Sequence, residues 1–407
     1  ILIPGETPID TYYANHPDEL FAKDNEPLVL TTSNRRVVCQ HYACAAAEVG
    51  GDEDAIDTSV LGESAESVRQ LRSEGRLDLD IFYRSDPHMQ VNIRSIGEGS
   101  YRLEHGRDEI GEIDEFHLLR ETYRNAIYRH GGLGYRVKDV IRGKRKVILE
   151  REYSWNETTP YIQKKIKLKR RHSVADYSDI MVATVAIDVT EFLVNVVERD
   201  RSGATVNQWN GNAGMPSHPL PTEGTMVLLR QPLWNSLVAQ LGTRAAKAAL
   251  QSCERLIAGL FPTITGPCDK QDYSSASEIR PDGQAAIYLY DMVYDGVDLS
   301  TAAFGKIAEL ISRAAERLST CSCDTDEGCF RCIANPRYPD PTSKSDTATM
   351  LDALQSIVDH TTPTVTHQPP DSAIEPIEER TATCPTCDDA VTAGDRFCRN
   401  CGEKLDV

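Results

Sequence analysis

The sequence predicts an α+β protein of several domains. Long stretches place apolar residues at helical spacing, short strands alternate with glycine turns, and two groups of four cysteines have metal-ligand spacing. A chain of 407 residues can also bury more than one core. We expect, in order, a connector (1–27), a winged-helix-like segment (28–88), a small β-barrel (89–172), an α/β zinc-binding domain (173–340), a helix and linker (341–380) and a zinc ribbon (381–407).

The overall charge is acidic. Asp and Glu number 62 against 44 Lys and Arg, which gives a formal net charge of -18 and a pI near 5.0. Such a chain repels phosphate at long range, so nucleic-acid contacts must come from local basic patches. An acidic surface is also typical of halophile-like proteins, because dense salt screens the repulsion. No signal-peptide pattern or membrane-spanning apolar run is present, and we expect a cytoplasmic location without a membrane partner.

The first residues indicate a connecting segment. Residues 8–21 carry aromatic anchors but no regular apolar period. The sequence opens at Ile1 rather than at Met, and residues 1–4 resemble the end of a strand. We therefore expect a fragment of a longer polypeptide or the product of a split gene.

Residues 28–88 favour a winged helix. Apolar spacing predicts helices over 34–49 and 64–74, followed by a strand over 77–83. The second helix offers only Arg69 and Arg72 as phosphate partners. DNA contact and a packing role both remain open for it, because basic charge dominates such binding.

Residues 89–172 read as a small β-barrel, since short strands separated by glycine turns recur over 91–168. Two basic runs stand out in this acidic chain, at 142–146 and 164–171. In the second run, alternate lysines share one strand face. Such a strand is either a solvated edge protected by lysines or a groove wall that tracks a phosphate backbone. The candidate contacts are Arg142, Lys144, Arg145, Lys146, Lys165, Lys167, Lys169, Arg170 and Arg171.

The next segment mixes helices and strands. The expected elements are strands over 180–187, 191–197 and 285–290, a polar loop over 199–223, and helices over 233–261 and 301–318. The last helix is amphipathic and delivers the chain directly to Cys321.

The first cysteine group is Cys321, Cys323, Cys329 and Cys332, in C-x-C and C-x-x-C pairs around Gly328. Thiolates at this spacing can converge on one tetrahedral zinc ion. The alternative is two disulfides, which a reducing cytosol disfavours. Four sulfur ligands close the coordination shell, so the predicted zinc is structural.

The second group follows a helix over 345–360 and a proline-rich linker. It comprises Cys384, Cys387, Cys398 and Cys401, with the C-x2-C-x10-C-x2-C spacing of a zinc ribbon. The alternative is four unconnected thiols in a tail that is too short for a core. So small a module needs a metal ion to fold, so we expect a second structural zinc.

The other cysteines favour buried packing. Cys39, Cys44 and Cys253 lie in helical or apolar contexts and behave as small hydrophobes. Cys268 precedes Asp269 and Asp272, which suggests either an acid–base site or a polar turn. The chain lacks a Walker loop, a G-x-S-x-G elbow and an H-E-x-x-H helix, so we predict no catalytic residue.

Several of these segments together carry a family resemblance. In order they are residues 9–13, 16–21, 110–114, 126–131, 268–272, 287–291 and the four-cysteine loop. Over about 8–336 the chain resembles the C-terminal half of superfamily 2 DEAD/DEAH-box DNA helicases of the mitomycin-repair-factor type. It departs from that family at Tyr294-Asp295-Gly296, where the family has Gly-Gly, and in the extra zinc ribbon.

The resemblance implies a division of labour. Two RecA-like domains upstream in the same polypeptide would bind ATP and Mg²⁺. The first four cysteines would be the zinc ligands of the domain that ends the family's proteins. Family members are implied to translocate on single-stranded DNA from 3′ to 5′ in DNA repair. The implied partner is single-stranded or forked DNA, and the ribbon suggests a further protein or nucleic-acid contact.

Three functions remain open on the sequence. The first is the accessory region of an ATP-dependent DNA helicase, with catalysis upstream. The second is a stand-alone zinc-containing module that binds nucleic acid or protein without a motor. The third, a nuclease or other metal-dependent hydrolase, needs a metal with an open coordination position.

Overall fold

The computed structural model describes residues 3–22, 34–52, 55–56, 68, 73, 87–89, 91, 100–210, 217, 219–266, 268, 271–334, 342–367, 382–383 and 390–391. The chain divides into two compact units, of which unit 1 takes residues 1–31, 168–187 and 221–375, and unit 2 takes 32–167, 188–220 and 376–407. The division falls inside two long strands, β6 (Glu157–Asp176) and β7 (Ile180–Arg199). Both units contain helices and strands, so the predicted mixed α/β character is confirmed.

Unit 1 is built on a sheet with the strand order β10-β11-β9-β7-β6-β12. Its other strands are β9 (Leu220–Leu229), β10 (Tyr273–Ile279), β11 (Ala285–Asp291) and β12 (Thr364–His367). The β10–β11, β11–β9 and β12–β6 pairs are antiparallel. Every residue of β11 is buried, as expected for the continuous apolar strand predicted over 285–290.

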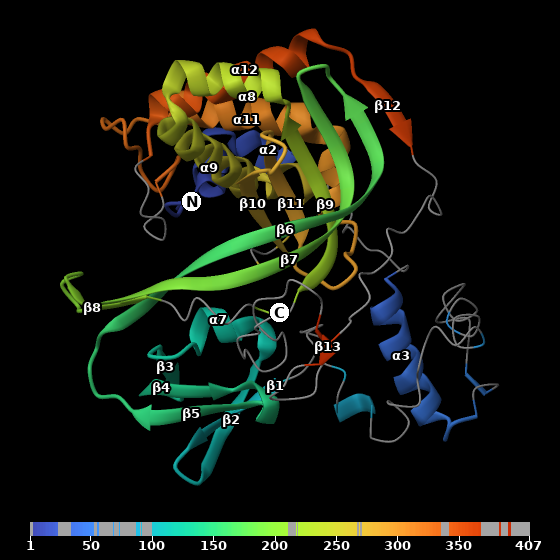
Figure 1. Ribbon diagram of the computed structural model, residues 1–407, viewed down its shortest axis with the longest axis vertical. Helices are drawn as coiled ribbons and strands as arrows, with labels where there is room; N and C mark the ends of the chain where they lie inside the picture. The colour runs from blue at the N-terminus through green and yellow to red at the C-terminus, as the bar shows by residue number, and fades with distance from the viewer. Residues whose placement is uncertain are drawn as a thin grey trace. The chain divides into compact units, whose positions relative to one another are not determined.

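Helices cover the sheet of unit 1 (Figure 1). They are α8 (Gln231–Leu241), α9 (Thr243–Leu260), α10 (Pro262–Thr265), the 3-10 helix η5 (Ser300–Lys306), α11 (Ile307–Ser319) and α12 (Lys344–His360). The helices α9, α11 and α12 pack against one another. Their shared core includes Leu250, Cys253, Leu256, Ile257, Leu310, Ile311, Ala314, Met350, Leu351 and Leu354.

Two short helices replace the aperiodic connector that we expected at the start of the chain. These are α1 (Pro8–Asn15) and α2 (Pro17–Ala22). Thr7 caps α1 by accepting a 3.2 Å hydrogen bond from the Asp10 N–H, and each helix begins with proline, which suits a first helical position. These capping signals were in the sequence. Apolar periodicity did not reveal the two helices, because they have only eight and six residues.

Three other expectations for the middle of the chain need correction. The two strands predicted over 180–187 and 191–197 form the single strand β7, because the intervening Val189 is 2% exposed and continues the ladder. The long helix predicted over 233–261 is divided at Gly242, whose φ of +87° is unfavourable for other residues. The predicted polar loop over 199–223 contains β8 (Thr205–Asn210), which pairs with β7.

Unit 2 contains a five-stranded sheet in the order β2-β1-β5-β4-β3. The strands are β1 (Ser100–His105), β2 (Asp108–Asp114), β3 (Ile127–His130), β4 (Leu133–Ile141) and β5 (Lys146–Arg151). In the described part of this sheet, β1 and β5 pair in parallel, whereas the β1–β2, β3–β4 and β4–β5 pairs are antiparallel. Its core combines residues of the sheet with Leu193 and Val196 of β7 and Leu118 and Leu119 of α7 (Leu118–Glu121).

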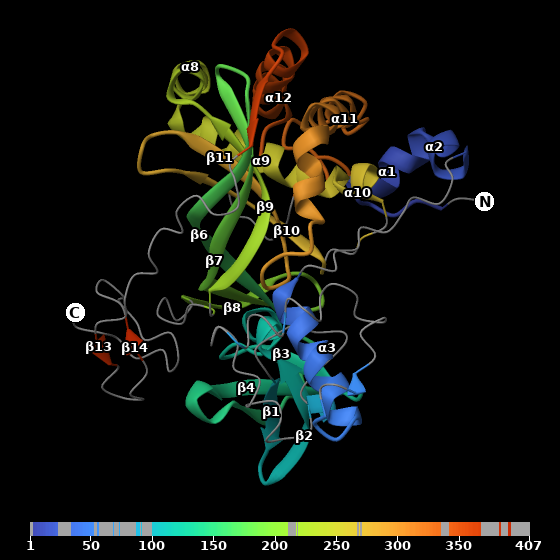
Figure 2. The same cartoon turned by 90° about the vertical axis from the view of Figure 1, so that its right-hand side faces the viewer.

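This sheet differs from the small β-barrel expected over 89–172. Within the described residues, β2 and β3 are its two edges, so the sheet is open. The strand β6 pairs with β7 and β12 instead, because its 20 residues continue into a long hairpin with β7. Figure 2 shows this hairpin from the side. Short 3-10 turns complete the unit at η2 (Pro87–Met89), η3 (Glu115–His117) and η4 (Arg142–Lys144).

The winged-helix-like segment is described only in part. Its first predicted helix is confirmed as α3 (Arg35–Glu48), in which Asn34 accepts a 3.0 Å cap bond from the Val37 N–H. Val68 and Ser73 are helical, but the rest of the predicted second helix and strand lies outside the described residues. The predicted ribbon is represented by β13 (Ala382–Thr383) paired with β14 (Ala390–Val391), and its four cysteines also lie outside the described residues. In the part of the chain that is described, no helix is long and apolar enough to cross a membrane.

Candidate metal centre

The four cysteines of the 321–332 loop converge. The Sγ atoms of Cys321, Cys323, Cys329 and Cys332 all lie within 4.8 Å of one another. Cys321 Sγ is 3.5 Å from Cys323 Sγ and 3.6 Å from Cys329 Sγ, and Cys332 Sγ is 3.8 and 3.9 Å from the Sγ atoms of Cys323 and Cys329.

These distances fit zinc. A tetrahedral ion with Zn–S bonds of about 2.3 Å holds its sulfurs about 3.8 Å apart. A disulfide requires about 2.05 Å, and all eight cysteines among the described residues are free. The two-disulfide alternative is therefore wrong for this loop, and its donor set fits one zinc ion.

Local chain geometry shapes the loop. The helix α11 ends at Ser319, two residues before Cys321, so a rigid amphipathic helix positions the first ligand. Gly328 has a φ of +77°, and a Cβ placed there would lie 2.5 Å from Ile333 Cγ1 and 3.0 Å from Cys332 Sγ. Glycine is thus required both for the left-handed turn and for the space beside the fourth sulfur.

Hydrogen-bond donors surround the sulfurs. Lys344 Nζ donates to the carbonyl oxygens of Cys321 and Cys323 at 3.2 and 3.3 Å and lies 3.5 Å from Cys323 Sγ. The Cys329 N–H points at Cys332 Sγ at 3.1 Å. A zinc ion with four thiolates carries a net charge of -2, so these donors stabilise the charge that the metal site would hold.

The loop also has a buried support. Arg317 of α11 is 3% exposed, and its Nε donates a 2.9 Å hydrogen bond to the carbonyl oxygen of Arg331. On the other side, the Lys344 and Ser345 N–H groups bind Asp326 at 2.6 and 2.9 Å, at the start of α12. The helix α11 thus holds the end of the loop at Arg331, and α12 holds its middle at Asp326.

The thiols differ in acidity because they share one small space. Burial opposes ionisation of Cys321, but hydrogen bonds from neighbouring cysteines lower its pKa to about 7. Burial raises the pKa of Cys332 to about 12. Four thiolates this close require a cation between them, and a bound zinc ion would supply it.

The arrangement allows one chemical role. Four sulfur ligands satisfy a tetrahedral ion and leave no position for water or substrate. The site can therefore stabilise the fold around α11 and α12, and it offers no hydrolytic chemistry. This argues against the metal-dependent hydrolase considered from the sequence.

The remaining described cysteines stand apart from this cluster. Cys253 and Cys39 are 0% and 4% exposed, in agreement with the packing role expected for them. Burial raises the pKa of Cys253 far above its ordinary value, so it is an inert thiol. Cys44 and Cys268 are half-buried, and Cys268 Sγ lies 3.7 Å from Thr265 Oγ1. Asp269 lies outside the described residues, so the acid–base alternative stays a prediction.

The first basic run is split by burial. Arg142 is 6% exposed and lies beneath the surface, whereas Lys144 and Arg145 are exposed on the η4 turn. Lys146 Nζ forms a 2.5 Å ion pair with Glu104. Only two of these four residues therefore present an exposed side chain.

The second basic run follows β6. Lys165 and Lys167 are exposed on either side of Ile166, which is 8% exposed, so the expected alternation holds there. Lys169, Arg170 and Arg171 are half-buried, and burial together with Arg280 lowers the pKa of Arg171. DNA contact by either run stays a prediction.

Comparison with known proteins bears on the metal centre directly. Residues 253–333, which include all four cysteines, match the family model of the MrfA Zn-binding domain. The predicted resemblance to helicases of the mitomycin-repair-factor type is confirmed. The matched segment runs from the second half of α9 through β10, β11 and α11 to the end of the cysteine loop, so it covers part of the helical layer and the sheet edge of unit 1.

The likeness extends beyond this domain. The chain is 23% identical over 353 residues to the uncharacterized ATP-dependent helicase YprA of Bacillus subtilis (strain 168), covering 82% of this chain and 45% of that protein. It is 22% identical over 362 residues to the ATP-dependent helicase hrq1 of Schizosaccharomyces pombe, covering 81% of this chain and 32% of that protein. The chain thus spans less than half the length of these curated relatives.

A solved structure shares the fold. A crystal structure of the DUF1998 helicase MrfA bound to DNA superposes with a TM-score of 0.51 at 19% identity, over 86% of this chain and 46% of that one. This likeness concerns the fold alone, and it covers most of both units.

Sequence reasoning predicted the four cysteines that converge in this loop, but it missed Lys344 and Arg317 beside them. Lys344 stands 21 residues after Cys323. Its only local signal is Ser343, which caps α12 and fixes Lys344 as the first helical residue. Arg317 lies within the helix predicted over 301–318, and its acceptor is 14 residues further along the chain, so no local pattern connects the two.

Proposed function

We propose that this chain is the C-terminal accessory region of an ATP-dependent DNA helicase that acts in DNA repair. In this proposal it guides single-stranded or forked DNA, and its zinc braces the assembly. ATP and Mg²⁺ would bind upstream RecA-like domains of the same polypeptide. The observation that carries the proposal is the four-thiol cluster inside a segment that matches the MrfA Zn-binding domain.

The comparisons support the motor context. Both curated relatives are named ATP-dependent helicases, and the likeness to each extends over more than 80% of this chain. The chain itself has no Walker loop. A zinc ion with four sulfur ligands also suits an accessory domain, because it makes the fold more rigid and leaves no coordination position for catalysis.

The finer organisation forms part of the proposal. Residues 28–88 would form a winged helix beginning with α3, and residues 381–407 would bind a second structural zinc through Cys384, Cys387, Cys398 and Cys401. That ribbon would contact a protein or nucleic-acid partner. The free thiols of the described cysteines suit the reducing cytoplasm, where we place the protein.

DNA would lie along the exposed basic side chains. Lys165 and Lys167 are exposed on β6, Lys144 is exposed on η4, and Arg145 is exposed directly after it. In a chain of net charge -18, such groups are the ones that can offset phosphate repulsion. Lys169, Arg170 and Arg171 would contribute as half-buried neighbours, whereas Arg142 and Lys146 would position the turn.

Binding of a fluorescent oligothymidine across a salt series tests this proposal. We expect the parent chain to bind with a clear salt dependence, and Lys165→Glu with Lys167→Glu to weaken binding and flatten the salt slope. The matched control is Arg244→Glu with Lys247→Glu, which makes the same charge change at two exposed positions of α9. Absence of binding by the parent chain, or equal losses in the two double variants, contradicts the proposed DNA path.

A further inference from the structure

A short loop between β5 and β6 presents two aromatic side chains to solvent. Tyr153 is 81% exposed and Trp155 is 62% exposed. Large aromatic side chains usually bury most of their area, because each removes a large apolar surface from water. Two of them on one five-residue loop, 152–156, call for a partner.

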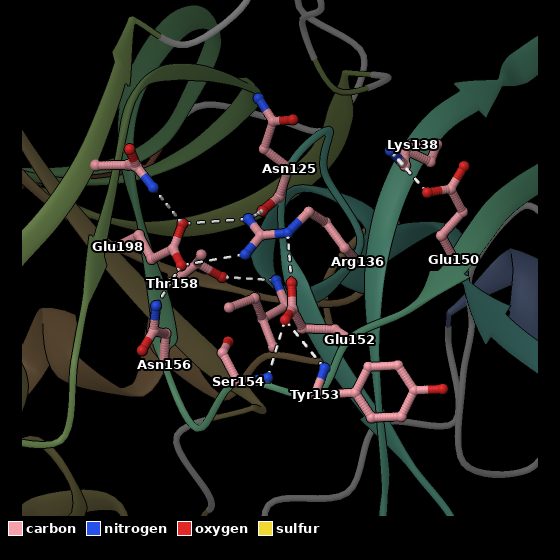
Figure 3. A network of polar contacts seen from close by, with 12 residues as sticks. Asn125, Arg136, Lys138, Glu150, Glu152, Tyr153, Ser154, Asn156, Thr158 and Glu198 are labelled. Atoms are coloured by element: carbon pink, nitrogen blue, oxygen red, sulfur yellow. Dashed lines mark hydrogen bonds and ion pairs between the residues drawn. The ribbon is translucent and has the colours of Figure 1, made fainter.

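Partly buried charges hold this loop in place, as Figure 3 shows. Glu152 accepts hydrogen bonds from the Tyr153 and Ser154 N–H groups at 3.0 and 2.9 Å and from Arg136 Nε at 2.7 Å. The Tyr153 ring points away from these contacts. Hydrogen bonds from the loop's own N–H groups to Glu152 therefore fix the start of the loop, and the Tyr153 ring stays exposed to solvent.

A second carboxylate fixes the end of the loop. Glu198 of β7, 1% exposed, accepts from Asn156 Nδ2 at 2.6 Å and from Arg136 Nη2 at 3.1 Å. Asn207 Nδ2 of β8 also donates to it at 3.1 Å. Burying charged groups is costly unless each one is paired. In this network the carboxylates are paired, and their hydrogen bonds hold the exposed loop 152–156 in one conformation before any partner binds.

Arginines surround the two rings. The guanidinium carbons of Arg201 and Arg129 lie 4.3 and 5.3 Å from the centre of the Trp155 ring, and that of Arg151 lies 5.7 Å from the Tyr153 ring. Arg129 and Arg151 donate to the neutral carbonyl oxygens of Asn156 and Gly134. Among the described residues none of the three arginines forms a salt bridge, so their positive charge is not offset by a carboxylate there.

We propose that Arg129, Arg151, Tyr153, Trp155 and Arg201 form a stacking platform for unpaired bases of a nucleic-acid strand. The aromatic rings take the bases, and the arginines take the phosphates on either side. Base–aromatic stacking tolerates any sequence because every base has a π face, and guanidinium groups add phosphate and cation–π contacts. This inference rests on the proposed function, because it presumes a DNA strand along unit 2.

Charge complementarity selects this occupant. An acidic protein partner would satisfy the arginines alone, and an apolar peptide would satisfy the rings alone. A single strand alternates a flat apolar surface with a phosphate, which matches the alternation of rings and guanidiniums on this platform. Base-paired DNA hides its base faces, so the platform should favour single strands over duplex.

The test compares an oligothymidine with an oligonucleotide of equal length whose bases are replaced by abasic sites. We expect the parent chain to bind the thymidine strand more tightly than the abasic strand, and Tyr153→Ala with Trp155→Ala to abolish that preference. Each lost stacking contact weakens thymidine binding roughly 5- to 150-fold. Both side chains are more than half exposed, so these changes leave the fold intact, and circular dichroism verifies this.

Two further variants separate the roles. Tyr153→Phe should retain the base preference because the ring remains, and Arg201→Gln should reduce the salt slope while the base preference persists. Phe21→Ala is the matched control, since Phe21 is a 75% exposed aromatic residue of unit 1.

The outcomes are distinguishable. If the parent chain binds neither strand, the proposed function fails. If the parent chain binds the thymidine and abasic strands equally, or if the double alanine variant keeps the parent's base preference, the platform is overturned while the proposed function stands.

Discussion

Lys344 Nζ lies 3.5 Å from Cys323 Sγ and donates hydrogen bonds to the carbonyl oxygens of Cys321 and Cys323. Lys344 itself is the first residue of the helix α12, which follows the cysteine loop in the chain. This lysine joins the metal loop to α12, whose Met350, Leu351 and Leu354 enter the core of unit 1. One side chain thereby links the cysteine loop to the packed helical layer.

The zinc content of the chain is the first prediction. We expect about two zinc ions in the parent chain and one in each of Cys329→Ser and Cys398→Ser, because each four-cysteine site binds one ion. Elemental analysis of the purified chain gives the count. Two ions in either variant would exclude the site to which that cysteine belongs.

The Lys344 contact leads to the second prediction. Lys344→Met removes a positive charge beside the thiolates, and we expect zinc affinity to fall roughly 10- to 100-fold, as for other losses of groups that support metal ligands. Competition with a chromophoric chelator measures this change. Lys247→Met, at an exposed position of α9, is the control and should leave the affinity unchanged. Equal affinities of the two variants would show that Lys344 does not support the site.

Gly328 supplies the third prediction. Gly328→Ala places a Cβ 2.5 Å from Ile333 Cγ1 at a φ of +77°, so we expect a loss of about 2 kcal/mol or more in stability. Thermal unfolding of the zinc-loaded chain reports it. Gly305→Ala meets nothing within 4 Å and serves as the control. A Gly328→Ala melting temperature equal to that of Gly305→Ala would contradict the steric requirement.

The fourth prediction concerns pH. Burial opposes the charged form of Glu198, but hydrogen bonds from Arg136, Asn156 and Asn207 lower its pKa below the ordinary 4.5. A lowered pKa in the folded state means that Glu198 stabilises the fold above its ordinary pKa, and that this contribution disappears as pH falls through the folded pKa.

Urea unfolding at several pH values tests this dependence. We expect Glu198→Gln to cost about 3 kcal/mol at pH 7, because it leaves buried donors without their anion, and to lose less stability than the parent on acidification. Glu150→Gln is the control, since Glu150 is 61% exposed in its ion pair with Lys138 and should contribute less than about 1 kcal/mol. Parallel pH profiles of the parent and Glu198→Gln would refute the role of this network.

By itself, the sequence determined the features that depend on near neighbours. Cysteines within twelve residues of one another can meet only in a tight loop, so their spacing predicted the metal site. Apolar spacing likewise predicted the amphipathic helix that contains α11, and a continuous apolar run predicted the buried strand β11, because burial on one face or on both faces leaves a direct trace in the residue pattern.

Only the tertiary structure decided which distant groups meet. It buried Arg142, which the basic run had placed at the surface, and it paired Lys146 with Glu104. It joined Arg136 to Glu198 across 62 residues and brought Arg201 over Trp155. The charge and polarity of these side chains allow many such pairs, since the chain holds many other carboxylates and basic groups. The fold decides which of these chemically equivalent groups come into contact. That selection turns two ordinary aromatic residues into an exposed, pre-organised surface.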